Sequence, residues 1–426
     1  MNKRTKTALR RWCLYGWTFA KWTMAASAIG VVCGLIGTMF HFGVHEVTAF
    51  RGTHPWVLYL LPLAGFVIMS FYKLTETDGL GTDDIIDAVH EGKRLPILLL
   101  PAIFFGTVLT HLCGGSAGRE GAALQMGGTI GQCMGRTFRL DDRDLRVATL
   151  AGMAAFFSAL FGTPLAATVF AIMVISIGVI YHVALYPSLL AALVAYGVSV
   201  RLGVEPTRFT VAVPDQSVGM FVRVAALGVL CALVSILFCK LMHGAGHLMK
   251  RIKNPWLRVI CGGFAVITLT WVFGTDYNGA GMDIVTRAIE QETVAVPWAF
   301  LLKLVFTAVT LAAGFKGGEV VPSFFVGATF GCAVSPLLGL PVGFGAAVGL
   351  AAVFCGVTNC PVASTLLAVE LFGAEGMLYF ALACCLSYML SGYQGLYSSQ
   401  TILYSKLKAQ FINVHTNAYH AGEKTE

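Results

Sequence analysis

Hydrophobic residues follow one another along this chain in long runs, and short polar segments separate the runs. Two runs, residues 147–200 and 320–369, contain no Asp, Glu, Lys or Arg. A helix needs roughly 20 apolar residues to cross a bilayer, so each run is long enough to cross it about twice. An outer-membrane barrel would instead alternate polar and apolar positions in segments of about ten residues. The pattern therefore predicts membrane helices.

Shorter apolar runs surround these two, and several are too short to span a bilayer upright. They cover residues 24–44, 56–71, 95–112, 220–238, 259–273, 297–315 and 376–404. Together the runs amount to on the order of ten or more membrane segments. We therefore expect an all-α polytopic membrane protein with tilted and re-entrant helices.

Composition and charge fit a chain embedded in lipid. Of its 426 residues, 57% are hydrophobic and only 12% are charged, whereas a soluble domain carries about 25% charged residues. Much of the net charge of +7 lies in two basic clusters, at residues 3–11 and 250–253. Under the positive-inside rule both clusters are cytoplasmic. The chain is therefore expected to be a multi-pass protein of the plasma membrane.

Composition also argues against other kinds of site. The chain has no basic face with a nucleic-acid-binding motif, so no nucleic-acid partner is expected. The twelve cysteines lie mostly in apolar runs without a Cys-x-x-Cys pair, and the ten histidines form no metal-ligand spacing. We therefore predict no metal and no cofactor.

The chain repeats part of its own sequence. The block at residues 118–131 returns in outline at 318–331, an offset of 200 positions. The shared residues are Gly118 and Gly318, Gly127 and Gly327, Thr129 and Thr329, and Gly131 and Gly331. A second block, 161–168, resembles 358–365 at nearly the same offset. A repeat of this length in a transporter indicates two structural halves.

The duplication divides the chain into predicted regions. We expect a cytoplasmic segment at residues 1–22, a first membrane half at 23–215, a second at 216–411, and a short tail at 412–426 without a regulatory domain. Whether the two halves are inverted depends on the number of membrane spans in each half. The short apolar segments leave that number open. We expect inverted topology, as in many transporters.

Glycine-interrupted apolar segments occur at corresponding places in the two halves. Irregular backbone at membrane depth persists only where it is buried or lines a cavity. A helix that begins there points its free N–H groups and the positive end of its dipole into the cavity, which suits an anion. The candidate segments begin near Thr82, Glu120, Val320 and residues 395–397. The alternative is that the glycines serve close helix packing.

Glu120 stands between Gly118-Arg119 and a long apolar stretch. A carboxylate at membrane depth costs at least about 2.5–3.5 kcal/mol without a partner, so such residues are functional candidates. Ionised, it could occupy the anion site itself, and protonated it could swing out and admit an anion. The alternative is a pair with Arg119 at the membrane edge.

Glu319 takes the position of Arg119 in the second block, and Lys316 stands three residues before it. Either the two form an interfacial ion pair, or Glu319 is a second carboxylate on a proton path. Tyr397 follows a glycine and carries a hydroxyl that could donate to an anion. An aromatic residue of the membrane belt is the alternative for this tyrosine.

Three motifs resemble those of the CLC family of chloride channels and anion/proton exchangers. Residues 118–121 (Gly-Arg-Glu-Gly), followed by 125–128, resemble the gating-glutamate motif. Residues 317–322 (Gly-Gly-Glu-Val-Val-Pro) resemble the second pore motif, and 396–398 (Leu-Tyr-Ser) the segment with the anion-coordinating tyrosine. With the repeat, the resemblance covers the chain from about residue 44 onward.

The resemblance implies a homodimer of two inverted halves per subunit, with one pore in each subunit. Glu120 would be the external gate, with Glu319 as a second proton-transfer residue. The anion would bind near Gly118, Arg119, Gly121, Val320, Val321, Tyr397, Gly81 and Thr82.

The chain departs from the family pattern at several positions. The first pore motif, Gly-Ser-Gly-Ile-Pro, is absent, and residues 79–84 read Gly-Leu-Gly-Thr-Asp-Asp. Ala122 replaces the usual proline, and no acid occurs at residues 173–174, where chloride exchangers carry an inner glutamate. Fluoride/proton exchangers of the family share the missing inner acid and the acid at Glu319, and they lack the usual serine. These traits slightly favour fluoride as the transported anion. The residues typical of the fluoride branch at the first pore motif, however, are not matched.

The leading hypothesis is therefore a halide/proton antiporter for chloride or fluoride, with fluoride export slightly favoured. The alternative is a passive chloride-selective channel of the same fold, which the missing inner acid would suit. A membrane enzyme is disfavoured, because Ser116 lies in no Gly-x-Ser-x-Gly elbow and has no histidine placed to activate it.

Overall fold

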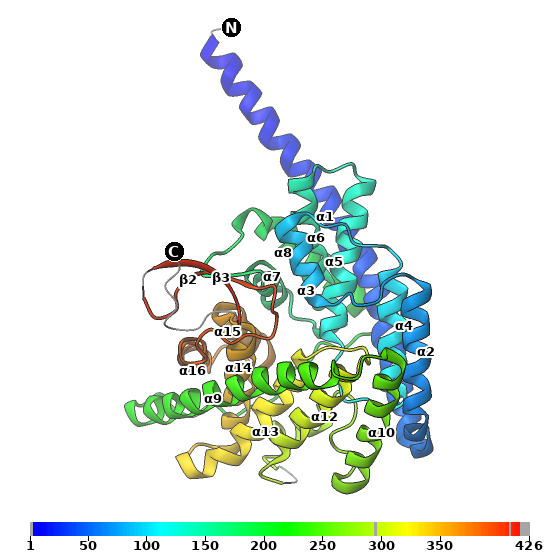
Figure 1. Cartoon of the computed structure of the whole chain (residues 1–426). Coiled ribbons are helices and arrows are strands. Elements are labelled where there is room, and N and C mark those ends of the chain that lie inside the picture. Colours follow the sequence, from blue (N-terminus) through cyan, green and yellow to red (C-terminus); the bar gives the residue numbers. More distant parts are fainter. Residues whose placement is uncertain (1–2, 294–295, 409, 418–426) are drawn as a thin grey trace.

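The computed structural model describes residues 3–293, 296–408 and 410–417, apart from the side chains of residues 3–10. Helices make up most of the described chain (Figure 1). The first half contains α1 (Lys3–Thr53), η1 (Pro55–Leu60), α2 (Leu61–Leu74), α3 (Thr82–Glu91), α4 (Leu99–Leu112), α5 (Glu120–Thr137), α6 (Asp142–Phe161), α7 (Pro164–Met173), η2 (His182–Ala184) and α8 (Leu185–Arg201). The second half contains α9 (Val218–Met249), α10 (Pro255–Phe273), α11 (Met282–Glu290), α12 (Ala299–Ala313), α13 (Val320–Leu338), α14 (Val342–Thr358), α15 (Pro361–Phe372) and α16 (Met377–Leu390).

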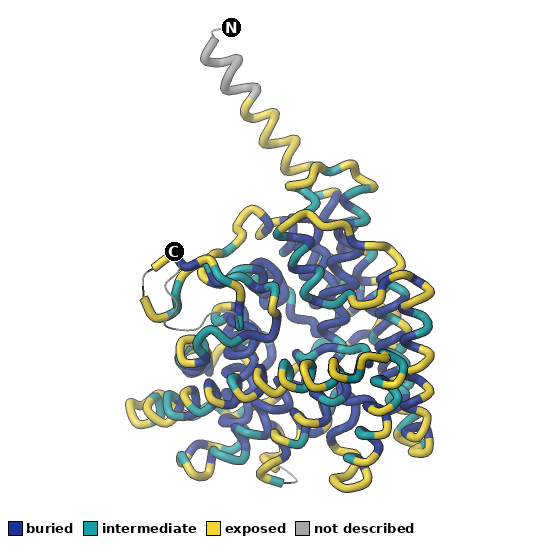
Figure 2. Tube along the Cα trace, viewed as in Figure 1, coloured by how far each residue is buried: buried dark blue, intermediate teal, exposed yellow. Residues whose placement is uncertain are grey.

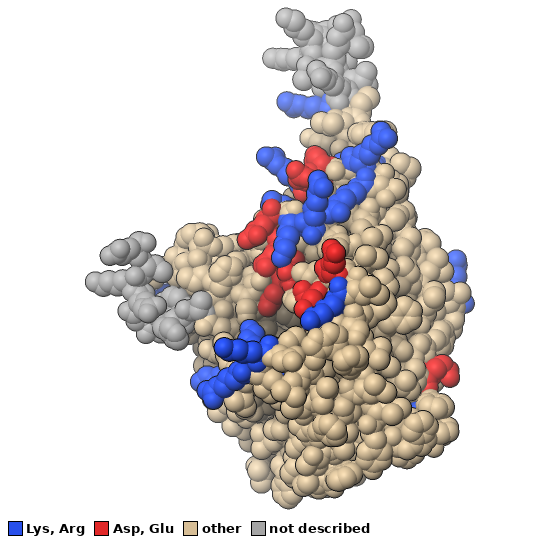
Figure 3. Space-filling view, turned by 45° about the vertical axis from the view of Figure 1, so that its right-hand side comes forward, with Lys and Arg blue, Asp and Glu red and all other residues tan. Residues whose placement is uncertain are grey.

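The helices have the lengths expected of a multi-pass membrane protein. Among the described residues, 7 helical segments are long and apolar enough to cross a membrane. Shorter apolar helices, among them α4, α7 and α15, are too short to cross upright. On the face shown in Figure 3, charged side chains gather over the upper part, and a broad area with few charges lies below them. This area is suited to contact with lipid.

The two halves meet at a pair of backbone hydrogen bonds between equivalent glycines. The amide of Gly118 donates to the carbonyl of Gly318 at 2.7 Å, and the amide of Gly318 donates to the carbonyl of Gly118 at 2.8 Å. The two residues thus form an isolated antiparallel bridge. Helices α5 and α13 begin two residues beyond it, at Glu120 and Val320. The bridge therefore fixes the starts of both helices at the centre of the molecule.

Other duplicated glycines serve helix packing, as the alternative interpretation proposed. A Cβ atom added to Gly127 on α5 would lie 2.3 Å from the carbonyl oxygen of Gly152 on α6. The same contact recurs in the second half, where a Cβ on Gly327 would lie 2.4 Å from the carbonyl oxygen of Gly349 on α14. Each pair of helices therefore crosses backbone to backbone.

The second duplicated block forms matching helix breaks. Gly162 ends α6 and Asn359 ends α14, both with a left-handed backbone conformation. Pro164 and Pro361 follow at the first helical position, where the missing N–H is not needed. Glu370, near the end of α15, accepts hydrogen bonds from two amides in the first turn of α7 at 3.1 and 2.8 Å. The last turn of α15 in the second half thus caps the start of α7 in the first half.

The C-terminal segment forms a small sheet that the sequence did not predict. Strand β2 (Thr401–Tyr404) pairs in parallel with β1 (Ser176–Ile177) and antiparallel with β3 (Phe411–His415). The proposed boundary at 215/216 lies between α8 and α9, whereas those at 22/23 and 411/412 fall within α1 and β3. Helix α1 continues through residue 22 because it contains no proline that would end it there.

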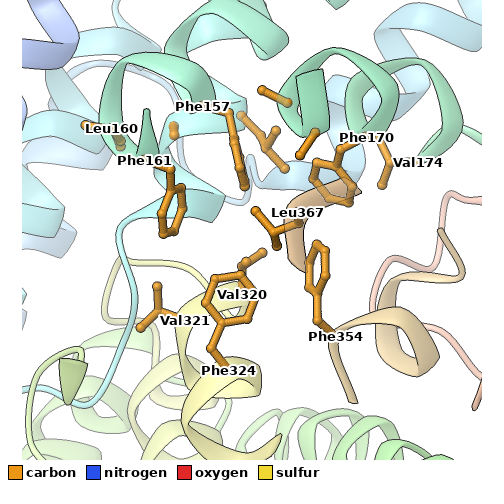
Figure 4. Packing of buried hydrophobic residues seen from close by; sticks show 14 of the residues in the cluster. Phe157, Leu160, Phe161, Phe170, Val174, Val320, Val321, Phe324, Phe354 and Leu367 are labelled. Carbon is orange, nitrogen blue, oxygen red and sulfur yellow. The ribbon is translucent and has the colours of Figure 1, made fainter. Parts of the chain in front are cut away.

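The interior is closely packed around the centre. Figure 2 shows the buried residues concentrated in the middle of the helical body, while residues 11–20 of α1 are exposed. Five phenylalanines close a ring of aromatic contacts across the two halves (Figure 4). Around this ring, consecutive centroids lie 4.9–5.8 Å apart, in the order Phe157, Phe161, Phe324, Phe354 and Phe170.

The glycine crossings predict a sharp difference between two Gly→Ala substitutions. A Cβ at Gly152 would lie 2.0 Å from the carbonyl oxygen of Gly127, whereas one at Gly197 on α8 would meet nothing within 4 Å. Gly152→Ala should lower the free energy of unfolding by about 1–3 kcal/mol through overpacking. Gly197→Ala should be neutral or slightly stabilising, since alanine favours helix. Unfolding in a denaturing-detergent titration measures both, and equal midpoints would contradict the close crossing.

Candidate functional site

Glu120 is the first residue of α5, and its side chain folds back over the start of its own helix. The carboxyl Oε2 accepts a hydrogen bond from the backbone amide of Arg119 at 2.9 Å. The amides of Glu120 itself and of Val321, on α13, also interact with this carboxyl group. A Cβ on Gly118 would lie 2.5 Å from Oε2, so only glycine leaves room for this position. The carboxylate therefore occupies the place where two helix starts present free N–H groups.

Arg119 lies beside the carboxylate. Its Nε atom is 3.5 Å from Oε1 of Glu120, and the exposed fractions of the two side chains are 18% and 0%. On its other side, Nη1 of Arg119 donates to Nδ1 of His41, on α1, at 2.9 Å. The pair anticipated from the sequence exists, but it lies inside the protein rather than at a membrane edge. Oε1 of Glu120 has no hydrogen-bond partner within the described part of the chain.

A cavity of about 710 Å³ opens in front of Glu120, and we call it the outer cavity. One face of the C-terminal part of α1 forms a wall, with His41, His45, Thr48 and Gly52. The other charged or titratable residues that line it are Arg51, His111, Arg119, Glu120, Asp276, Asp283 and Arg287. Val321 lines it too, so both helix starts reach this space.

Two cations, Lys303 and Arg51, donate to backbone carbonyl groups beside the outer cavity. Lys303 is fully buried and donates to the carbonyl oxygens of Tyr277 at 3.1 Å and of Gly279 at 2.6 Å. Arg51 donates to the carbonyl oxygen of His111 at 2.6 Å. The bonds of Lys303 satisfy carbonyl groups of the loop between α10 and α11, and that of Arg51 adds a donor at the last turn of α4.

A second cavity of about 300 Å³, the inner cavity, contains other predicted residues. Its polar and charged lining residues are Tyr72, Thr82, Asp83, Asp84, Gln125, Lys316, Glu319 and Tyr397, and Gly81 lines it as well. The hydroxyls of Tyr72 and Tyr397 are buried and have no hydrogen-bond partner among the described residues. Unpaired donors of this kind are suited to a small anion or water.

The start of α3 forms one wall of the inner cavity. Asp84 accepts a hydrogen bond from the amide of Gly81 at 2.9 Å, which closes a capping turn around Thr82. Asp83 accepts a hydrogen bond from the amide of Ser399 at 3.1 Å, so α3 is tied to the C-terminal segment. Burial raises the pKa of Asp83, and the Ser399 amide opposes that shift.

The two cavities share no lining residue, and the glycine bridge lies between them. Gly118, Gly121 and Val320 are buried there and line neither cavity. A Cβ on Gly121 would lie 3.4 Å from Oε2 of Glu319, so this second carboxyl group approaches the bridge from the inner side. The labelled apolar side chains in Figure 4, including Val320 and Phe324, fill the space around the start of α13.

The structure thus distributes the predicted site residues over two places. Arg119, Glu120 and Val321 lie at the outer cavity, whereas Gly81, Thr82, Glu319 and Tyr397 lie at the inner one. The expectation of a helix starting at residues 395–397 is wrong. The amides of Gly395 and Leu396 donate to Asn417 and to the carbonyl oxygen of Val357, because the C-terminal segment turns there toward strand β2.

The Lys316–Glu319 ion pair considered from the sequence is not among the ion pairs of the described residues. The Lys316 amine instead lies 4.1 Å from the centroid of the Tyr72 ring. Sequence reasoning also missed His41, His111 and Gln125. Ionisable residues inside apolar runs are functional candidates, and this signal could have identified both histidines.

Comparison with known proteins gives a consistent result. A family model described as voltage gated chloride channel matches residues 61–392. A chloride/fluoride channel protein of Pseudomonas syringae pv. tomato is 39% identical over 399 residues, covering 91% of this chain and 88% of the relative. The H(+)/Cl(-) exchange transporter ClcA of Cronobacter sakazakii is 26% identical over 379 residues, covering 82% of this chain and 81% of the relative.

Solved structures agree with the sequence relatives. The crystal structure of a CLC-type fluoride/proton antiporter matches with a TM-score of 0.88 and 32% identity, covering 91% of this chain and 99% of that one. A slow cyanobacterial Cl−/H+ antiporter matches with a TM-score of 0.75 and 19% identity, covering 87% of this chain and 94% of that one. The predicted all-α, CLC-like fold is therefore confirmed.

The two cavities predict opposite accessibility to thiol reagents. Ala49 lines the outer cavity and Leu80 the inner one. In a background lacking the exposed native residues Cys13, Cys261 and Cys385, a membrane-impermeant reagent should label Ala49→Cys only from outside. Leu80→Cys should be labelled only from the cytoplasmic side. Labelling of both from one side would contradict the separation, and a reversed result would contradict the cytoplasmic N-terminus.

Proposed function

The chain belongs to the CLC family of voltage-gated chloride channels and related transporters, and we propose from this premise that it is a halide/proton antiporter. One observation carries the proposal. The Glu120 carboxylate lies on the backbone amides at the starts of α5 and α13, at the outer cavity, and the glycine bridge separates it from the inner cavity. A place where backbone amides hold a carboxylate has the chemistry of an anion-binding site.

A proton on Glu120 would exchange this carboxylate for a transported anion. The ionised group is stabilised by the N–H groups and by Arg119, as any anion would be. The protonated group loses that stabilisation and leaves the amides free for a halide. Because anion and proton then use the site in alternation, their movements are coupled. The outer cavity gives the carboxyl group access to protons.

Glu319 supplies the inner end of the proposed proton path. Its carboxyl group faces the inner cavity and approaches Gly121 at the bridge. The inner acid of chloride exchangers is missing at Met173 and Val174, so another group must accept cytoplasmic protons. Glu319 is suited to this role, and Tyr397 in the same cavity could donate its hydroxyl to the anion.

We favour fluoride over chloride as the transported anion. The proposed anion contacts are compact N–H and O–H donors, and a small, strongly hydrated anion needs such donors to replace its water. A relative 39% identical is a chloride/fluoride channel protein, and a structure 32% identical is that of a fluoride/proton antiporter. Export of fluoride from the cell is the direction we propose.

A passive anion channel of the same fold is the second candidate. The absence of an acid at residues 173–174 favours it, since a channel needs no inner proton donor.

We further propose that the protein lies in the plasma membrane with its N-terminus in the cytoplasm, and that it forms a homodimer with one pore in each subunit. Family membership supports these proposals and gives no reason to expect an enzyme.

Reconstituted protein should couple the two ions through Glu120. In proteoliposomes, an outward fluoride gradient should drive protons inward against their own gradient. Glu120→Gln should abolish proton movement while anion flux persists, because the amide cannot carry a proton through the cycle. Fluoride and chloride electrodes, together with a pH electrode, should follow the same preparation, with faster fluoride efflux expected. Fluoride-driven proton uptake that survives Glu120→Gln would contradict the gate, and uncoupled flux in the wild type would identify a channel.

Glu319 should be needed for proton transfer from the inner side. Glu319→Gln is expected to lower the proton flux at least tenfold while leaving anion movement measurable. Asp83→Asn is the matched control, because Asp83 lines the same cavity and an asparagine can keep the bond from the Ser399 amide. The ratio of proton to anion flux separates the two variants. An unchanged ratio in Glu319→Gln would remove Glu319 from the path.

A further inference from the structure

The guanidinium group of Arg119 is held from two sides. Its Nε atom faces Oε1 of Glu120 at 3.5 Å, and its Nη1 atom donates to Nδ1 of His41 at 2.9 Å. His41 belongs to α1, and Arg119 immediately precedes α5. One cation thus connects the candidate gate to a histidine 78 positions earlier in the chain.

The chemistry of the two groups determines which one donates. Arginine carries five N–H donors, has no acceptor and stays protonated in proteins. Nδ1 of His41 must therefore accept with its lone pair, which requires a neutral imidazole with its proton on Nε2. A protonated imidazole has N–H groups at both nitrogens. Proton uptake by His41 therefore breaks this hydrogen bond and places two cations side by side.

We propose that His41 is a positioning residue for the gate and makes its opening sensitive to the outer pH. Neutral His41 holds Arg119 where its charge stabilises the ionised carboxylate of Glu120, which is the closed gate. A proton on His41 releases the guanidinium group and weakens that stabilisation. The inference rests on the proposed function of Glu120 as a gate, and it adds a second outer group that responds to protons.

The surroundings of His41 allow it to exchange protons with the outside. It is half-buried and lines the outer cavity. His45 stacks parallel to it one turn further along α1, at 6.5 Å between ring centroids, and lies 3.7 Å from Glu46. On α1 itself, Arg51 also faces this cavity. The charged or titratable groups that face it from other elements are His111 of α4, Arg119 and Glu120 at the start of α5, Asp276 of the loop after α10, and Asp283 and Arg287 of α11.

The position of the accepting atom allows a sharp test. The Oδ1 atom of an asparagine can take the place of the histidine Nδ1, so His41→Asn keeps an acceptor but cannot titrate. His41→Phe keeps a ring of similar size but has no acceptor. His41→Ala, which is smaller, provides a second acceptor-free variant if the phenylalanine variant does not fold. A role limited to packing α1 would not separate the first two variants by their pH response.

The measurement is the rate of fluoride efflux from proteoliposomes as a function of the outer pH. Without an acceptor at position 41, Arg119 stabilises the closed gate less. The pH at half-maximal rate should therefore rise by about one unit in His41→Phe and His41→Ala. In His41→Asn, Arg119 stays held at every pH, so the midpoint should equal the wild-type value or lie below it. Midpoints that coincide in all variants, or move together in one direction, would overturn the proposal.

His45 supplies the matched control. It lies on the same helix and lines the same cavity, and its Nδ1 atom lies 3.7 Å from Glu46 rather than beside the gate. His45→Phe should leave the midpoint within about 0.2 units of the wild type, a small fraction of the shift expected for a lost charge contact. If the wild type carries fluoride without protons, the antiport proposal fails, but the efflux rate still reports how His41 controls the gate. A coupled wild type with no midpoint shift in the acceptor-free variants would overturn the role of His41 alone.

Discussion

Two hydrogen bonds between Gly118 and Gly318 determine where the candidate functional site of this protein lies. The bridge leaves no room for a side chain, since a Cβ on Gly318 would lie 2.2 Å from the amide nitrogen of Gly121. From the bridge each half enters a helix within two residues. The free N–H groups of α5 and α13 are therefore fixed relative to each other by backbone geometry alone. Side chains may change around this centre without moving its donors.

The fixed donors explain why a carboxylate at membrane depth is tolerated. A charged group there costs at least about 2.5–3.5 kcal/mol when it is unpaired. Glu120 offsets part of this cost with the amides of Arg119 and Val321 and with the nearby guanidinium group. The same donors would stabilise a halide equally well, because they recognise charge and acceptor atoms rather than the carbon skeleton. In the mechanism we propose, carboxylate and anion therefore compete for one place, and the proton decides which of them occupies it.

The sequence predicts the parts of this arrangement that are local in the chain. The repeated block around Gly118 and Gly318 predicted where α5 and α13 begin, because glycine breaks and apolar runs are visible in short windows. It could not predict that the amides of Gly395 and Leu396 would already be paired, since their partners, Asn417 and Val357, lie in distant segments. The contact of His41 with Arg119 was hidden for the same reason. Hydrogen bonds between distant residues leave no period in a single sequence.

The duplicated scaffold carries groups that are not duplicated. Position 119 holds an arginine at the outer cavity, and its equivalent, position 319, holds a glutamate at the inner cavity. The outer cavity therefore presents a cation beside the anion site, where the inner one presents a carboxyl group. If both positions carried the same residue, the two cavities would offer an ion nearly the same chemistry. Reversal of charge at one repeated position makes them different. In the mechanism we propose, the outer side thereby attracts the anion while the inner side supplies the proton.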